Sequence, residues 1–287
     1  MPLYLISPLV IGSWALVLVG LERRFPYQPG YRVFRPEFFN DFVMYTFVQS
    51  YVLGFVIALV IRVLDDLTHM SDLGLVSRWP VWAQLGFFIV THDFWQYWFH
   101  RVQHRNRFLW RIHEAAHAPL HVDWLSGSRS HALEILVAQT AEFAPIFLLG
   151  ASPDVALYKG MIDAVWGMFN HSNIDVRMGR LLYVLNGPEL HRWHHDLDTP
   201  RGGVNLGTKL TIWDWVFGTA HYPRDRKPAR YGLHKSREFP HGSYLRQLVY
   251  AFRPMSPNTL PEDASPLGTP APSSARDAAS GSIRGRA

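Results

Sequence analysis

The sequence predicts an all-α fold: a polytopic helical bundle that crosses a membrane about four times and carries a helical cap on the cytosolic side. Three observations support this prediction. Apolar runs of about 20 residues recur along the chain, long enough to span a bilayer. Histidines recur at i, i+4, the spacing that places two side chains on one helix face. The chain is 14% aromatic with 11 Trp, a composition typical of membrane proteins with interfacial aromatics.

The first two expected spans are strongly apolar. Residues 3–21 have no basic residue before them, and one acidic and two basic residues follow. Because no small-residue cleavage site is evident, we interpret this run as a retained membrane helix rather than a signal peptide. The second expected span is residues 38–63, which carries no charged side chain from Phe42 to Ile61.

The later spans are more polar. Residues 81–99 contain an adjacent His and Asp, so part of this helix is expected to face the bundle interior. Residues 133–150, broken at Pro145, and residues 155–169 follow. The last two segments predict a helical hairpin that enters the membrane and returns.

The distribution of arginine predicts the orientation. Four arginines follow the first span, whereas only two follow the second. The positive-inside rule then places the N-terminus outside and residues 22–40 in the cytosol. With the hairpin, every histidine cluster falls on the cytoplasmic face.

Composition also bounds the domain organisation. We expect one membrane domain over residues 1–253, followed by a disordered tail over residues 254–287 that is rich in Pro, Ser, Ala and Gly. The net charge of +5 comes mainly from short connecting segments, which indicates contact with anionic lipid headgroups and no nucleic-acid partner. The absence of cysteine excludes thiolate and iron–sulfur sites, so a metal must use nitrogen or oxygen ligands.

Histidine clusters indicate a metal centre. Eleven of the 15 histidines lie between His92 and His195. In HRVQH and HEAAH two rings share a helix face, and in PELHRWHHD the spacing i, i+3 and i+4 can serve two neighbouring metals. Imidazoles at the mouth of an apolar bundle are costly and usually functional. The candidate ligands are His100, His104, His113, His117, His171, His191, His194 and His195.

Two further side chains share a helix face with the first ligand pair. Asp93 and Tyr97 precede His100 by seven and three residues. We expect them to orient a ligand ring by hydrogen bonding.

HEAAH also matches the zinc metalloprotease signature, in which Glu114 would be the general base between His113 and His117. The extended form of that signature requires a glycine and a third histidine, but Leu120 and Asp123 stand at those positions. An intramembrane zinc protease also leaves the other histidine clusters unexplained, so it remains the alternative reading.

The order of these clusters resembles the fatty acid hydroxylase / sterol desaturase superfamily of membrane di-iron enzymes. The resemblance covers residues 93–219, and seven short boxes occur in the family's order. They are HRVQH, LWRIHEAAH, RSHALE, NHSN, HRWHH, NLG and WDWVFGT.

The resemblance implies two non-haem irons held by the eight candidate histidines, with zinc as a conceivable substitute, and supporting roles for His131 and Asn170 in the matched boxes. It implies O₂-dependent hydroxylation or desaturation of a C–H bond in a membrane-dissolved lipid, such as an acyl lipid, sterol-like or carotenoid molecule. Electrons would come from a separate donor, a ferredoxin or a cytochrome with its reductase. The short chain favours a multi-pass protein of a bacterial inner membrane.

One position departs from the family pattern. The second box reads H-x-x-H-H in the family, but Ala116 stands where a ligand is expected. Three interpretations stay open: His121 or His131 compensates, one metal is bound weakly, or the chain is a degenerate, non-catalytic member.

Overall fold

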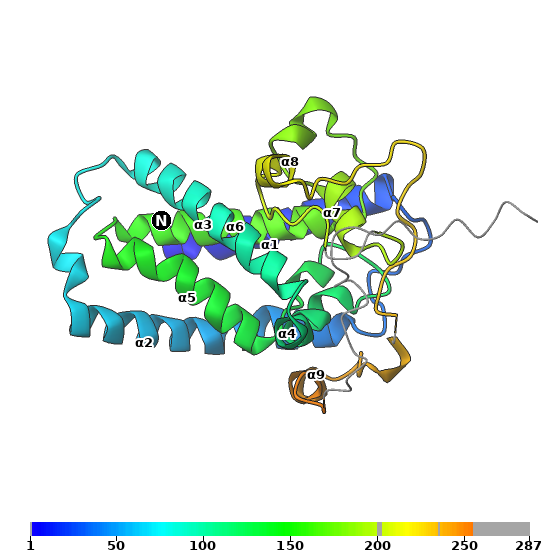
Figure 1. Ribbon diagram of the computed structural model, residues 1–287, viewed down its shortest axis with the longest axis horizontal. Coiled ribbons are helices and arrows are strands. Elements are labelled where there is room, and N and C mark those ends of the chain that lie inside the picture. Colours follow the sequence, from blue (N-terminus) through cyan, green and yellow to red (C-terminus); the bar gives the residue numbers. More distant parts are fainter. Residues whose placement is uncertain (1, 200–202, 235, 255–287) are drawn as a thin grey trace, which may run out of the picture.

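The computed structural model describes residues 2–199, 203–234 and 236–254, and within them it is helical without a β-strand, which confirms the predicted all-α class (Figure 1). The predicted tail lies outside the described residues except for Pro254. Five long helices form the bundle: α1 (Leu3–Arg24), α2 (Ser50–Thr68), α3 (Val81–Gln103), α5 (Ala132–Leu148) and α6 (Pro153–His171).

Shorter helices gather at one end of this bundle, on the right in Figure 1. They are α4 (Arg107–His117), α7 (Pro188–His195), α8 (Ile212–Phe217) and α9 (Tyr244–Tyr250). Single turns complete the helical content: η2 (Met70–Leu73), η3 (Ser126–Ser128), η4 (Gly179–Tyr183) and η5 (Ser236–Glu238). The predicted helical cap therefore exists as a physical layer at the end of the bundle.

Two described helices are long and apolar enough to cross a membrane: α1, and the continuous unit of η1 (Asn40–Gln49) and α2. Their outer faces expose large apolar side chains, among them Leu16 at 75% and Phe55 at 73%. Exposed apolar surface of this extent is typical of contact with a membrane or partner. The helices α3, α5 and α6 occupy the other expected spans, and they carry more polar side chains toward one another.

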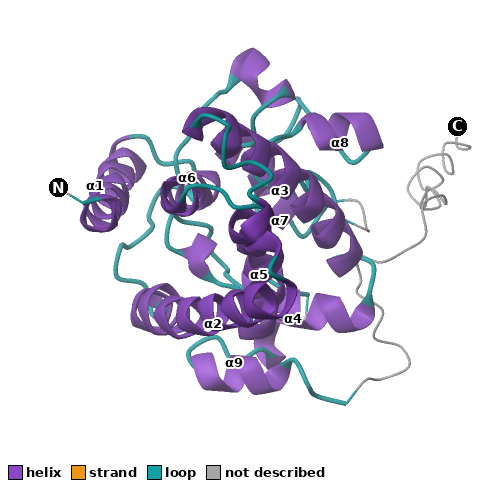
Figure 2. Ribbon diagram, turned by 90° about the vertical axis from the view of Figure 1, so that its left-hand side faces the viewer, coloured by secondary structure: helices purple, strands orange, loops and turns teal. Residues whose placement is uncertain are grey.

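The bundle packs as adjacent pairs, which Figure 2 shows nearly end-on. Helix α1 lies against α6, α2 lies against α5, and α3 lies against both α5 and α6. Buried Phe88, Ile146 and Val155 join the outer ends of these last three helices in one apolar cluster. This packing fixes the inner ends of α3 and α6, where two of the histidine boxes lie.

Two helix boundaries differ from the sequence prediction. The second span begins with the π-helical segment η1 and continues five residues beyond the expected end at residue 63. Pro145 does not break the fourth helix, because it lies in the last turn of α5, where its carbonyl still accepts the backbone N–H of Leu149 at 3.0 Å. Proline removes only its own backbone N–H from the ladder, and the helix continues past it to Leu148.

A buried ion network joins the cap to the bundle. Arg35 contacts Asp41 at 2.6 Å and Asp123 at 2.7 Å, and Arg129 contacts Asp41 at 2.6 Å. Loss of one partner would leave an uncompensated charge in the interior, which is strongly destabilising. The network therefore fixes the loop that follows α4 against the start of η1.

Candidate metal centre

All eight candidate ligands converge at the inner end of the bundle. The end of α3, helix α4, the end of α6 and helix α7 deliver them, so the site is assembled from segments far apart in the sequence. The rings divide into two groups. Within each group, the ring nitrogens that could bind a metal all lie within 4.8 Å of one another. We call them the five-histidine group (His100, His104, His113, His117 and His194) and the three-histidine group (His171, His191 and His195).

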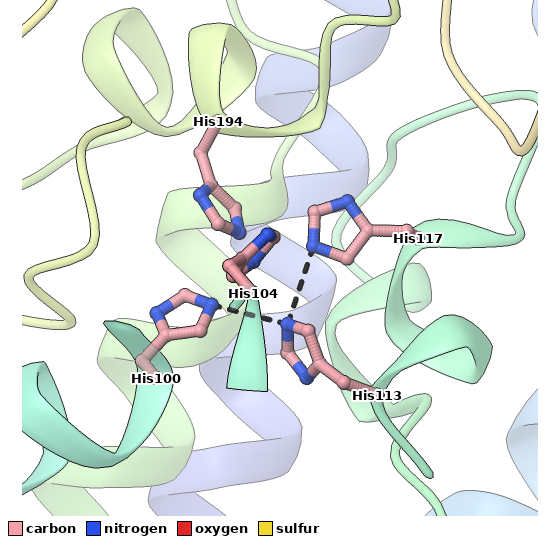
Figure 3. A group of neighbouring side chains, drawn as sticks. All are labelled: His100, His104, His113, His117 and His194. Carbon is pink, nitrogen blue, oxygen red and sulfur yellow. Dashed lines mark hydrogen bonds between the residues drawn. The ribbon is translucent and has the colours of Figure 1, made fainter. Parts of the chain in front are cut away.

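The five-histidine group has its rings turned toward a common centre (Figure 3). The Nε2 atom of His113 lies 3.1 Å from Nε2 of His100 and 3.2 Å from Nε2 of His117. Each of the five residues is buried. Asn106 precedes α4 and its side chain caps the helix, so the i, i+4 pair on α4 faces the centre from a well-anchored helix.

The three-histidine group lies directly beside it. The Nε2 atom of His191 lies 3.0 Å from that of His171, and Nε2 of His195 lies 3.1 Å from both. The ring of His195 is 4.6 Å from the ring of His117 between centroids, so the two groups adjoin.

Outer hydrogen bonds define which nitrogen of each ring faces inward. The carbonyl oxygen of Leu206 lies 2.9 Å from Nδ1 of His100, and that of Val204 lies 2.8 Å from Nδ1 of His194. A carbonyl only accepts, so each ring donates through Nδ1 and presents the Nε2 lone pair to the centre.

The same arrangement recurs on α4 and α6. Nδ1 of His113 lies 2.7 Å from Glu134, whose Oε1 also accepts the Gln103 amide at 2.9 Å. Nδ1 of His171 lies 2.9 Å from the carbonyl oxygen of Gly167. Outer partners of this kind fix the ring orientation and raise the basicity of metal-binding histidines.

These contacts make the donor set suitable for metal ions. The inward Nε2 atoms of His100 and His113 lie 3.1 Å apart and cannot satisfy one another, because the outer hydrogen bonds hold the proton of each ring on Nδ1. Both ring nitrogens of buried His104 lack a hydrogen-bond partner among the described residues. A cation between the rings accounts for both features, and an all-nitrogen set suits iron, zinc and copper.

Electrostatics keeps the rings neutral. Burial, followed by the proximity of His113, lowers the pKa of His194 to about 3. Burial is also the main cause that holds the pKa values of His117, His191 and His195 well below the usual value. Neutral imidazole is the form that binds a metal.

A short segment, residues 204–210, holds two of the ligands, and we call it the ligand strap. It supplies the carbonyls that bind the two rings described above. Asp93 of α3 accepts from Thr208 Oγ1 at 2.6 Å and from the backbone N–H groups of Lys209 and Leu210 at 2.8 and 3.1 Å. Asp214 accepts the backbone N–H groups of Leu206 and Gly207 in the strap, and burial raises the pKa of Asp214 to about 6.

Asp93 and Tyr97, which were expected to hydrogen-bond a ligand ring, contact other groups in the structure. Asp93 does not bond a ligand ring, because the ligand strap saturates its carboxylate. Tyr97 bonds Thr219 at 2.9 Å and accepts from Arg101 at 2.8 Å instead of meeting a histidine. Asn170 donates to the Thr208 carbonyl at 2.6 Å, so it supports the strap.

Two histidines that were candidates for compensation lie elsewhere. Nδ1 of His131 accepts the backbone N–H of Leu133, and its Nε2 lies 3.0 Å from the Leu248 carbonyl, so both nitrogens are occupied. The ring of His121 packs on Tyr31 at 4.4 Å. Neither belongs to a histidine group in the described residues, so the structure offers no histidine in place of Ala116.

Glu134 and the strap carbonyls were not identified from the sequence. Glu134 ends the RSHALE box, so its position in a box next to the ligands was the available signal. The carbonyls of Val204 and Leu206 carry no side-chain signature and could not be found from residue types.

The glutamate of HEAAH points to a different partner. Arg253 donates to both carboxylate oxygens of Glu114, at 2.8 and 2.9 Å. This bidentate pair occupies the group that the protease hypothesis needs as a free general base.

Comparison with protein families finds a match over the segment that carries these histidine boxes. The family model for fatty acid hydroxylase matches residues 85–219. The chain is 30% identical over 218 residues to the ornithine lipid hydroxylase OlsE of Rhizobium tropici, an alignment that covers 74% of this chain and 66% of that protein.

More distant relatives include alkylglycerol monooxygenase of Homo sapiens, 28% identical over 141 residues, with 49% of this chain and 31% of that protein covered. Methylsterol monooxygenase 2-2 of Arabidopsis thaliana is 26% identical over 152 residues, with 52% and 56% covered. The chain thus spans just under two thirds of the length of the first relative and less of the others. No solved structure matches the chain.

Proposed function

Because the chain belongs to the fatty acid hydroxylase family, we propose that it is an O₂-dependent oxidoreductase that hydroxylates a C–H bond of a membrane-dissolved lipid. The observation that carries the proposal is the pair of adjoining, buried histidine groups with inward lone pairs. The relatives named above are a lipid hydroxylase and two monooxygenases, all with lipid substrates in their names.

The two groups are proposed to hold two non-haem irons. Bound iron would supply the redox chemistry that reduction of dioxygen requires. The chain's own part is to fix the imidazoles: Glu134, the ligand strap and Gly167 each hold an outer ring nitrogen, which leaves the inner nitrogen free for metal. Burial of the rings keeps bulk water from the reacting region.

We place the protein in a membrane, with the cap and its histidines on the cytoplasmic face. The two apolar helices and their exposed outer side chains support membrane insertion. The four arginines in the last turn of α1 and in the segment that follows it support the orientation. A lipid would reach the site from the bilayer, while a soluble ferredoxin or cytochrome would deliver electrons to the cap.

The protease alternative finds no support in the site. Its signature histidines belong to a group with three more ligands from other helices, and its glutamate is bound by Arg253. The degenerate-member alternative depends on Ala116, and its test is metal binding by the three-histidine group.

The direct test uses purified, iron-loaded protein in lipid nanodiscs with an electron donor, O₂ and a bacterial lipid extract. We expect a lipid product heavier by one oxygen atom, with the label incorporated from ¹⁸O₂. The control variant is His194→Ala, which removes one inward nitrogen. A product that forms equally without O₂, or equally in H194A, would contradict the proposal.

A further inference from the structure

An ionic cluster lies in the bundle interior, away from the histidine groups. The fully buried Lys159 of α6 donates to Glu142 of α5, to Asp163 Oδ2 at 2.8 Å and to His92 Nδ1 at 3.1 Å. Lys209 of the ligand strap reaches Asp163 Oδ1 at 2.5 Å. These five residues, from three helices and the strap, are the ionic cluster, and its centre is filled by the Lys159 ammonium.

The cluster is complete in its charges. Two lysines face two carboxylates, and the three N–H bonds of the Lys159 ammonium have three acceptors. A charged lipid headgroup or a metal ion would therefore find no unpaired charge. Ionisable side chains inside a membrane bundle are costly, and proton transfer is among their established uses.

Several buried polar atoms without a hydrogen-bond partner lie on the parts of α3 and α6 between this cluster and the metal centre. In the described residues they include Nε2 of His92, Oε1 of Gln96 and Nε1 of Trp166. Gln96 lies one turn from His92 and one turn from His100 on the same face of α3, so the path along α3 is about 12 Å. Trp166 lies between Asp163 and His171 on α6. We call the side chains of His92, Gln96 and Trp166 the polar seam.

Water is the occupant that the chemistry of the seam selects. The amide oxygen of Gln96 can only accept a hydrogen bond, whereas the indole nitrogen of Trp166 can only donate one. A molecule that satisfies both must donate and accept, as buried waters do. An apolar lipid chain would leave every one of these groups without a hydrogen-bond partner, which is unfavourable in the interior.

We propose that water fills the polar seam and that protons pass along it from the ionic cluster to the metal centre. This inference rests on the proposed function. Hydroxylation breaks one C–H and one O–O bond, forms the C–O and O–H bonds of the alcohol, and releases the second oxygen atom as water. That balance consumes two electrons from the donor protein and two protons. The groups that face Glu142, and so govern its proton, are His92, Lys159 and Asp163.

Hydroxyl-radical footprinting tests the water directly, without turnover. In nanodisc-embedded protein, the indole of Trp166, whose Nε1 is buried, is expected to be oxidised, because radicals form from water beside it. Gln96→Leu removes the acceptor and is expected to abolish that label. Thr91→Val is the matched control, since Thr91 is exposed on another face of α3 and its hydroxyl donates to the Phe87 carbonyl at 2.8 Å. An unlabelled Trp166 in the wild type, or equal labelling in Q96L, would contradict the presence of water in the polar seam.

Turnover tests the protons. With metal content equal to wild type, Q96L and Glu142→Gln are each expected to lower kcat about 100-fold, with KM nearly unchanged and a larger solvent deuterium isotope effect. T91V is expected to match the wild type. Wild-type kcat and isotope effect in both Q96L and E142Q would overturn the proton route. A wild type that oxidises no lipid would overturn the proposed function and the proton role together, whereas the footprinting result judges the seam independently.

Discussion

The rings of His117 and His195 lie 4.6 Å apart between centroids, and they join the five-histidine group to the three-histidine group. His117 comes from α4 and His195 from α7, next to His194, which belongs to the other group. Because α7 contributes ligands to both groups, the two proposed metal positions lie next to each other. The two positions differ chemically, because one group offers five ligands and the other three.

Glu134→Gln is expected to weaken metal binding about 10- to 100-fold, because His113 loses the anionic acceptor that fixes its ring. Chelator competition followed by elemental analysis measures the affinity. Asp66→Asn, on the exposed surface of α2, is the matched control and should bind metal as the wild type does. Equal affinity in E134Q would mean that the carboxylate has no part in holding the ligand.

Ala116→His is expected to tighten binding of the second metal ion about tenfold or more, equivalent to about 1.4 kcal/mol. The reason is that the three-histidine group has fewer ligands than its neighbour, and position 116 adjoins His117 at their boundary. Ala116→Leu controls for side-chain size without adding a ligand. An unchanged second affinity in A116H would show that this position does not complete the group.

Asp93→Asn is expected to lower the free energy of unfolding by about 1–3 kcal/mol. The carboxylate accepts from Thr208, from two backbone N–H groups and from Trp213. The side-chain amide of asparagine would place its own N–H groups against some of these donors. Chemical unfolding in detergent measures the change, with Thr91→Val as the neighbouring control. Because the strap also holds His100, weaker metal retention should accompany the loss. An unfolding curve identical to the wild type would contradict this role.

Metal-free protein is expected to lose stability as the pH falls from about 7.5 to 5.5. The pKa of His194 is lowered from 6.5 to about 3 by burial and by nearby His113, so below pH 6.5 the unfolded chain takes up the proton first. Proton uptake then favours unfolding across the window from about 6.5 to 3, and at pH 5.5 this one group accounts for about 1.4 kcal/mol.

Thermal unfolding of chelator-treated and metal-loaded samples at the two pH values checks this linkage. The loaded protein should change less, because a ring bound to metal cannot take a proton until the metal leaves. Equal unfolding midpoints of the metal-free protein at the two pH values would contradict the neutral, buried state of the rings.

The sequence predicted the helices and the residues of the site better than it predicted which of them contact one another. The i, i+4 pairs on α3 and α4 identified which rings share a face, since helix geometry alone determines that. Which pair joins which group depends on how four helices meet, and local periodicity contains no such information. Pro145 was interpreted as a helix break because the sequence does not show how close it lies to the helix end.

Indirect support of the ligands was hardest to predict. Asp93 shares a face with His100, yet it acts through the ligand strap, which arrives from more than 100 residues later. His92, Glu142 and Lys159 appeared as separate polar residues on three apolar segments. Their contact arises only from the packing of α3, α5 and α6, which tertiary structure alone reveals.

The most direct test of the central claim is metal content per chain, measured by elemental analysis of detergent-purified protein after anaerobic iron loading. The two adjoining groups predict two irons in the wild type, with the second more easily removed by chelator. H194A should lose iron, whereas His121→Ala, a histidine outside both groups, should not. A single zinc that is lost on substitution of His113 but retained in H194A would contradict the di-iron account.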